Sequence, residues 1–291
     1  MHVLRRFFAT TLTLALGTAL AVPAMAQAPR NWQLGMQDAA SPVAERMHSL
    51  HELVFWIVTI ITVFVAGLLV YVIWRFNSRR NPVAASFSHH TGLEIAWTVI
   101  PVLILVVIAI PSFRLVFFED RIQNADMTIK VTGHQWYWEY SYPDSGNLNF
   151  RSDYVHDEDL KPGQNRLLDV DNPLVLPVGK NIRILTTSAD VIHSFFIPAL
   201  GVQRYSIPGR TIETWVRVDR PGTYYGQCNQ ICGTNHSYMP IAVVGVPAAE
   251  FQAWEKTAKV KFAAGAPIPA PAPALAQAAE PTTIRVAQVQ P

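Results

Sequence analysis

Two long apolar stretches stand out in the pattern of hydrophobic and polar positions. Residues 53–74 and 95–113 contain no charged side chain, and each is long enough to cross the hydrocarbon core of a bilayer as an α-helix. The link between them carries Arg75, Arg79 and Arg80 and no acidic residue before Glu94. By the positive-inside rule, this link is cytoplasmic and both flanks of the hairpin face the exported side.

A shorter apolar run lies at the N-terminus. Arg5 and Arg6 precede it, and a small-residue A-x-A motif ends at Ala26, which together are typical of a secretory signal peptide. The run is too short to be a third membrane span. We therefore predict a signal peptide over residues 1–26 and an exported segment over residues 27–49.

From about residue 126 the pattern changes to short segments rich in β-branched and aromatic residues. Turn clusters such as IPGR and RPGTY separate them, which favours an all-β barrel or sandwich. Segments with strand character are MTIKVTGHQWYWEY, RLLDVD, NIRILTT, TIETWVRV and PIAVVGV. Residues 247–259 predict one closing helix. From Ala263 the chain is rich in alanine and proline, which is typical of a flexible tail.

The predicted fold class is thus a two-helix transmembrane hairpin joined to an all-β domain. The hairpin covers residues 50–119, the exported β-domain with its closing helix 126–262, and a disordered tail 263–291. Half of all residues are hydrophobic, 15% are charged, and the net charge is +2. This composition agrees with a membrane protein, and nothing in it suggests a nucleic-acid partner.

The strongest chemical signal is YGQCNQICGTNHSYMPI, residues 225–241, which holds both cysteines of the chain. A disulfide is common in exported chains, but it leaves His236 and Met239 unexplained. A Cys2His2 zinc site needs one more histidine and has no use for a thioether. Thiolate, imidazole and a weak thioether are the ligands of copper electron-transfer sites, and two thiolates can bridge two coppers.

A bridged copper pair needs a second imidazole, one for each metal. The exported domain offers His134, His156 and His193 besides His236. His156 lies in an acidic loop and His134 adjoins an aromatic strand. His193 lies between β-like segments in SADVIHSFFIP, and we expect it to be the second imidazole.

The apolar spans together with HQWYWEY, DVIHSFFIPALGVQ, IPGR and YYGQCNQICGTNHSYMPI resemble subunit II of the haem–copper cytochrome c oxidases over residues 45–260. The ordered set H…C-x3-C-x3-H-x2-M carries the resemblance. It implies a cupredoxin-like domain with a binuclear copper centre of the CuA type, which accepts electrons from cytochrome c. These electrons pass to haem in subunit I, where oxygen is reduced. Such a chain is a subunit of a proton-translocating oxidoreductase and by itself only relays electrons.

The resemblance also implies a ligand set for two copper ions. The bridging thiolates would be Cys228 and Cys232, the terminal imidazoles His193 and His236, and the weak axial ligand Met239. The backbone carbonyl of Gln230 would be the other axial donor. The family usually has glutamate at that position, and its side chain reaches a magnesium ion shared with subunit I. Gln230 offers a neutral oxygen, which weakens the expectation of magnesium because this ion prefers carboxylate and water oxygens.

Three further site predictions follow from the resemblance. Trp136, in HQWYWEY, would be the electron-entry point. Acidic residues dominate the segment 139–171, and Asp171 and Asp190 would be docking acids for cytochrome c. Glu94 would lie at the entrance of a proton channel that continues in subunit I. The plainer interpretations are packing for Trp136, a solvated surface for the acids, and a helix-terminal carboxylate for Glu94.

The implied partners are oxidase subunits I and III, cytochrome c and membrane lipid, with no nucleic acid. The implied location is the bacterial inner membrane, with both termini and the copper domain on the periplasmic side. The main alternative is a membrane-anchored copper-binding electron-transfer protein or copper carrier outside an oxidase. A quinol oxidase subunit, a nitrous oxide reductase copper domain and an exported module with a disulfide fit the sequence less well.

Overall fold

The structure, a computed structural model, describes residues 28–120 and 124–263 of the chain. The predicted signal peptide and nearly all of the predicted tail lie outside these residues. The helices are α2 (Pro42–Arg75), α3 (Thr91–Asp120) and α4 (Ala248–Lys261). The strands are β1 (Met127–His134), β2 (Tyr137–Tyr142), β3 (Leu148–Ser152), β4 (Leu174–Pro177), β5 (Ile182–Ser188), β6 (His193–Ile197), β7 (Val202–Ser206), β8 (Ile212–Val216), β9 (Gly222–Cys228) and β10 (Pro240–Val246).

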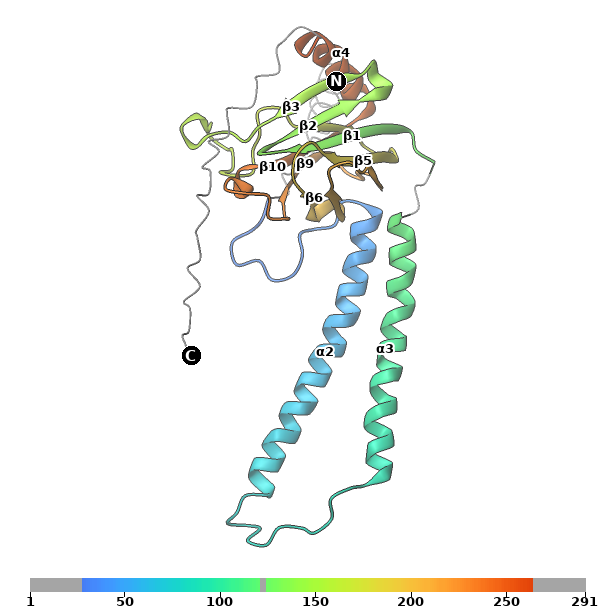
Figure 1. Ribbon diagram of the computed structural model, residues 1–291, viewed down its shortest axis with the longest axis vertical. Helices are drawn as coiled ribbons and strands as arrows, with labels where there is room; N and C mark the ends of the chain where they lie inside the picture. The colour runs from blue at the N-terminus through green and yellow to red at the C-terminus, as the bar shows by residue number, and fades with distance from the viewer. Residues whose placement is uncertain (1–27, 121–123, 264–291) are drawn as a thin grey trace, which may run out of the picture.

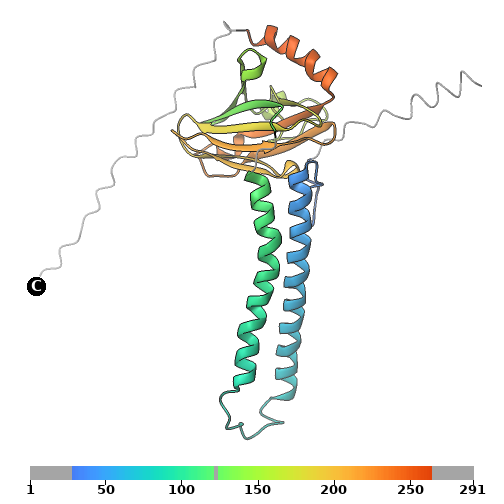
Figure 2. The ribbon, with the colours of Figure 1, turned by 90° about the vertical axis from the view of Figure 1, so that its right-hand side faces the viewer.

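Helices α2 and α3 form a hairpin that extends from one side of the β-domain (Figures 1 and 2). Both are long and apolar enough to cross a membrane, and neither apolar stretch is buried within the protein. They extend beyond the uncharged runs, because polar turns at their outer ends continue each helix toward the β-domain. Ser41 caps α2 by accepting the N–H of Ala44, and Pro42 fits the first turn, where no backbone donor is needed.

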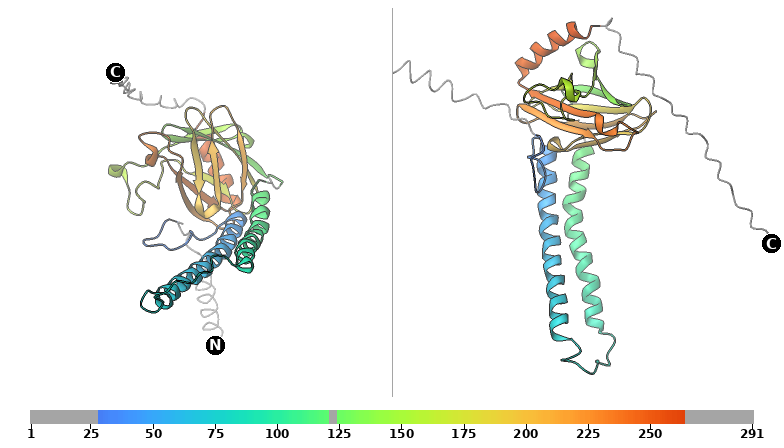
Figure 3. Two further views of the ribbon diagram at one scale, coloured as in Figure 1. Left: turned by 60° about the horizontal axis from the view of Figure 1, so that its bottom comes forward. Right: turned by 90° about the vertical axis from the view of Figure 1, so that its left-hand side faces the viewer.

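The β-domain is a sandwich of two five-stranded sheets, with strand orders β3-β2-β1-β5-β8 and β4-β10-β9-β6-β7. Strand β1 pairs with β5 in parallel and β4 with β10 in parallel, while the other pairs are antiparallel. Figure 3 shows the sheets stacked above the helices, with α4 on the far side of the domain. The predicted fold class, a two-helix hairpin plus an all-β domain, is confirmed.

The core of the sandwich is aromatic. Trp138, Tyr140 and Phe195 are fully buried, and the rings of Trp138 and Phe195 meet edge to face with centroids 5.2 Å apart. Such edge-to-face pairs stabilise a core beyond the burial of apolar area alone. The fully buried side chains of β2 are those of Trp138, Tyr140 and Tyr142, at every second position of the strand. The segment MTIKVTGHQWYWEY nevertheless folds as two antiparallel strands, because the chain reverses at Gln135 and Trp136.

One segment with predicted strand character does not form a strand. Residues 166–171, RLLDVD, belong to a turn in which Leu167 adopts a positive φ of 59°. The carboxylate of Asp169 accepts the N–H of Asn165 at 2.5 Å and the hydroxyl of Tyr225 at 2.9 Å. These side-chain hydrogen bonds offer the backbone an alternative to a sheet ladder.

The start of α2 is attached to the β-domain through the segment that follows β6. The Ser41 hydroxyl donates to the carbonyl of Leu200 at 2.7 Å, and the N–H of Ala40 donates to the carbonyl of Ala199 at 2.8 Å. All four residues are buried. The first membrane helix is therefore connected to the β-domain by hydrogen bonds that water does not reach.

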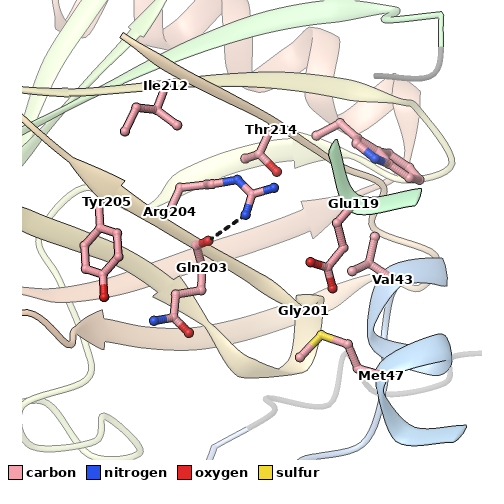
Figure 4. Close-up of a pocket in the computed structure, with 10 residues that line it drawn as sticks. Val43, Met47, Glu119, Gly201, Gln203, Arg204, Tyr205, Ile212 and Thr214 are labelled. Carbon is pink, nitrogen blue, oxygen red and sulfur yellow. Dashed lines mark hydrogen bonds between the residues drawn. The ribbon is translucent and has the colours of Figure 1, made fainter. Parts of the chain in front are cut away.

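The end of α3 is attached separately. The indole N–H of Trp215 donates to the carbonyl of Phe118 at 3.0 Å, and Arg204 pairs with Asp120 at 2.7 Å. A cavity of about 350 Å³ lies beside these contacts, and Figure 4 shows Arg204 and Glu119 among its lining. The cavity lies at the junction of the helices with β7 and β8.

Tyr142 connects the two sheets. Its hydroxyl donates to the carbonyl of Val175 and accepts the N–H of Val175, both at 3.0 Å, and its side chain is fully buried. We expect Tyr142→Phe to lower the free energy of unfolding by about 1–3 kcal/mol, because both backbone groups of Val175 lose their partner. Denaturant unfolding of the detergent-solubilised chain measures this. Tyr205→Phe, at a tyrosine 47% exposed, is the matched control, and an equal loss in both variants would contradict the assignment.

Candidate metal centre

A short pairing between β6 and β9 brings the candidate ligands together. His193 is the first residue of β6 and Cys228 the last of β9, and the register pairs Phe195 with Cys228. The chain then turns back through Cys232 toward β10. The ligand atoms of His193, Cys228 and Cys232 lie within 4.8 Å of one another, and all three residues are buried.

The loop after β9 adds the other predicted ligands. The Sγ of Cys232 lies 3.4 Å from His236 Nδ1 and 3.5 Å from Met239 Sδ, and Cys228 Sγ lies 3.3 Å from the carbonyl of Gln230. The two cysteines are free, with their sulfurs 3.9 Å apart, whereas a disulfide requires about 2.0 Å. The structure therefore brings all six predicted ligand residues into one cluster.

His193 has one ring nitrogen without a partner. Its side chain is fully buried, Nε2 lies 2.8 Å from Asp190 Oδ1, and Nδ1 has no hydrogen-bond partner. Burial lowers the pKa of His193, against the opposing effect of the Asp190 carboxylate. Burial therefore favours the neutral imidazole, which is the form that binds a metal. A buried nitrogen without a partner calls for an explanation, and a metal bound at this atom would supply one.

The donor set selects the kind of metal. Two sulfurs from cysteine, two imidazoles and a thioether suit copper, whereas zinc sites do not use methionine and magnesium or calcium need oxygen ligands. Burial, with the neighbouring Cys228, raises the pKa of the Cys232 thiol to about 12. A metal ion bound at this sulfur would favour the thiolate over the thiol. The residues present therefore fit a copper centre.

Trp136 lies against the ligand loop. Its indole N–H donates to the carbonyl of Cys232 at 3.3 Å, and the side-chain amide of Gln135 donates to the same oxygen at 2.8 Å. A Cβ on Gly233 would lie 2.8 Å from the Trp136 ring, and the φ of Gly233 is +126°. Gln135 and Gly233 were not among the site residues predicted from the sequence. A glycine directly after Cys232 is the sequence feature that could have indicated that another group, here the Trp136 ring, packs closely against this loop.

The remaining predicted residues lie in different places. Asp190 contacts His193, as described above. Asp171 is exposed and accepts the N–H of Asp153 at 2.8 Å. Glu94 lies in the first turn of α3, at the end of the hairpin remote from the β-domain (Figure 1). The structure therefore groups Asp190 with the ligand cluster and leaves Glu94 outside it.

A β-sandwich that gathers two thiols, two imidazoles and a thioether, carried on a membrane hairpin, defines a membrane-anchored copper electron-transfer protein. The family model "Cytochrome C oxidase subunit II, periplasmic domain" matches residues 127–246, and the corresponding transmembrane-domain model matches residues 29–115. The chain belongs to the cytochrome c oxidase subunit II family.

The subunit 2 sequences of Rickettsia bellii and Oenothera berteroana agree with this assignment. The probable cytochrome c oxidase subunit 2 of Rickettsia bellii is 52% identical over 229 residues, covering 79% of this chain and 85% of the relative. Cytochrome c oxidase subunit 2 of Oenothera berteroana is 44% identical over 237 residues, covering 79% and 92%. The crystal structure of the periplasmic domain of subunit II from Bradyrhizobium japonicum is 50% identical, with a TM-score of 0.46 and coverage of 49% and 100%.

Membership of the family fixes the general role of the chain. It is a membrane-bound electron-transfer subunit of cytochrome c oxidase, with a copper centre of the CuA type, and it acts together with other oxidase subunits. A copper carrier or an electron-transfer protein outside an oxidase is not favoured. The resemblance seen in the sequence is confirmed.

Gly133 leaves the room that His193 occupies. A Cβ at this position would lie 2.8 Å from Cδ2 of the His193 ring, and Gly133 does not have a positive φ. Gly133→Ala is therefore expected to displace the imidazole and to weaken copper binding about tenfold or more, as disturbed ligand support typically does. Copper retained against a chelator measures this. Gly67→Ala, where the new Cβ meets nothing within 4 Å, should retain copper as the wild type does, and parallel losses would refute the steric explanation.

Proposed function

We propose that this domain holds two copper ions, which receive electrons from cytochrome c and pass them to haem in subunit I. The proposed ligands are the thiolates of Cys228 and Cys232, the imidazoles of His193 and His236, the thioether of Met239 and the carbonyl of Gln230. The observation that carries the proposal is the approach of three buried ligand atoms within 4.8 Å. His193 is one of these three residues, and its Nδ1 has no hydrogen-bond partner.

When bound, the copper pair would accept and release one electron at a time. The contribution of the protein is a cluster whose ligands do not have to move. The carbonyl of Cys232 accepts two side-chain hydrogen bonds, and the carbonyl of Met239 accepts the indole N–H of Trp138 at 3.2 Å. A ligand loop fixed at both ends supports a small rearrangement between the oxidised and reduced forms, which favours fast electron transfer.

Trp136 is the proposed electron-entry residue. Its indole is partly exposed and makes a hydrogen bond to the backbone of a copper ligand, Cys232. An aromatic ring at the surface can meet a redox partner, and the hydrogen bond continues from that ring toward the cluster. The partial exposure of Trp136 and its hydrogen bond to Cys232 together support a direct route inward from the protein surface.

Cytochrome c is the proposed donor, docked through acidic residues that include Asp171 and Asp190. An acidic face accelerates the association of a basic partner by about 10–10³-fold, and salt weakens this effect. Asp171 is exposed and lies beside Asp153, which supports its part in such a face. The dependence of the rate of cytochrome c oxidation on salt concentration measures the contribution of these acids.

The proposed location is the bacterial inner membrane, with the copper domain in the periplasm and the link between α2 and α3 in the cytoplasm. The arginines of that link support this orientation. Glu94, at the same end of the hairpin, is the proposed entrance residue for protons. Proton uptake by an oxidase carrying Glu94→Gln tests that role. A magnesium ion near Gln230 has weak support, because the side chain lacks a carboxylate.

Loading the purified chain with copper tests the proposed centre. The wild type should bind two coppers, become purple and give a seven-line hyperfine pattern in EPR. Cys232→Ser should abolish this species, because one bridging sulfur is lost. Thr234→Ser, on the exposed part of the same loop, should retain it. A wild-type protein that takes up zinc and refuses copper would refute the proposal.

Trp136→Phe tests the entry route. The variant keeps an aromatic ring but loses the N–H that donates to Cys232. We expect an unchanged copper spectrum and electron entry from cytochrome c slower by orders of magnitude, measured by stopped-flow reduction of the centre. Trp254→Phe, at a tryptophan on α4 packed against Tyr142, should react as the wild type does. Unchanged entry in Trp136→Phe would remove this residue from the route.

A further inference from the structure

One carboxylate, that of Asp190, links the candidate metal centre to the strand reversal that carries Trp136. Asp190 lies between β5 and β6. Its Oδ1 lies 2.8 Å from His193 Nε2 and accepts the N–H of Val191 at 2.6 Å, while its Oδ2 accepts the N–H of Gln135 at 2.7 Å. Gln135 directly precedes Trp136 in the chain. The same side chain therefore contacts a candidate ligand and the backbone beside the candidate entry residue.

The hydrogen bonds of this carboxylate define the protonation of the imidazole. A carboxylate oxygen only accepts, so His193 Nε2 must carry the hydrogen of the 2.8 Å contact. In a neutral imidazole this leaves the lone pair on Nδ1, the buried nitrogen without a partner. A second group that fixes the tautomer and ring orientation of a ligating histidine is a general feature of metal sites.

The loop that holds Asp190 is itself fixed. The Ser188 hydroxyl accepts the N–H of Asp190 at 3.2 Å and donates to the carbonyl of Val191 at 2.5 Å. The N–H of Ala189 donates to the carbonyl of Gly133 at 3.0 Å. The adjacent ends of β1 and β5 therefore determine the position of the carboxylate. Binding of cytochrome c is not needed to place it.

We propose that Asp190 is a positioning residue of the metal centre, which holds the Nε2–H tautomer of His193 and ties the chain before Trp136 to that histidine. The inference rests on the proposed copper function. It assigns Asp190 a role inside the protein in addition to the proposed docking, because both of its oxygens accept hydrogen bonds from this chain and its side chain is 31% exposed.

The structure also explains why an aspartate is needed here. Three N–H groups point at the two oxygens, and an asparagine of the same shape has one accepting oxygen and one donating amide. With the amide nitrogen toward Gln135, two donors face each other. With the amide nitrogen toward His193, the imidazole is driven to the other tautomer, which places a hydrogen on Nδ1. Either orientation disturbs the arrangement.

The test uses the full chain in detergent, without cytochrome c. Asp190→Asn is expected to lower copper affinity about 10–100-fold, as loss of such support typically does, and to change the optical and EPR spectra of the copper that remains. Asp159→Asn, which removes the same charge from an exposed site, should match the wild type in affinity and spectra. Wild-type affinity and spectra in Asp190→Asn would overturn the inference and leave the residue a docking charge alone.

A second measurement needs no variant. Long-range ¹H–¹⁵N NMR of the metal-free wild-type chain, labelled in histidine, reports which nitrogen of each imidazole carries the hydrogen. We expect the Nε2–H form for His193, and the Nδ1–H form would overturn the inference even if copper binds normally. If the wild type refuses copper, the proposed function fails, while this spectrum still decides whether Asp190 sets the tautomer.

Discussion

The antiparallel pairing of β6 with β9 is the constraint on which the metal centre depends. Phe195 pairs with Cys228 and Phe196 with Gln227, so the first residue of β6 and the last of β9 lie beside each other. The loop after β9 then has to turn back over only a few residues to place Cys232 next to His193 and Cys228. The aromatic core under this pairing, with Phe195 against Trp138, keeps the two strand ends in register.

Much of this architecture could be predicted from the sequence. The uncharged runs indicated the hairpin, because each is long enough to cross the hydrocarbon core of a bilayer, and the short β-branched segments indicated the all-β domain. The spacing of Cys228, Cys232, His236 and Met239 along one loop predicted one cluster, since residues so close in sequence have little freedom to separate. His193 was also predicted, because a pair of copper ions requires a second imidazole.

Other features depend on tertiary contacts that a linear pattern does not contain. RLLDVD has the composition of a strand, yet the Asp169 carboxylate bonds back to Asn165 and the segment turns. The contact of Trp136 with the carbonyl of Cys232 requires two loops to meet. In the sequence, the only sign of this close approach is Gly233, where a side chain would collide with the Trp136 ring. The bond between Asp190 and His193 was hidden for another reason, because an acid three residues before a histidine suggests surface charge as readily as a hydrogen bond.

The buried attachment of α2 to the β-domain has a consequence for electron flow through the membrane complex. From His193, strand β6 leads within a few residues to Leu200, whose carbonyl holds Ser41 at the start of the helix. Tunnelling probability falls exponentially with separation, so a swaying domain would spread the transfer times over a wide range. The buried hydrogen bonds of Ser41 to Leu200 and of Ala40 to Ala199 would keep the metal centre at a constant distance from the start of α2.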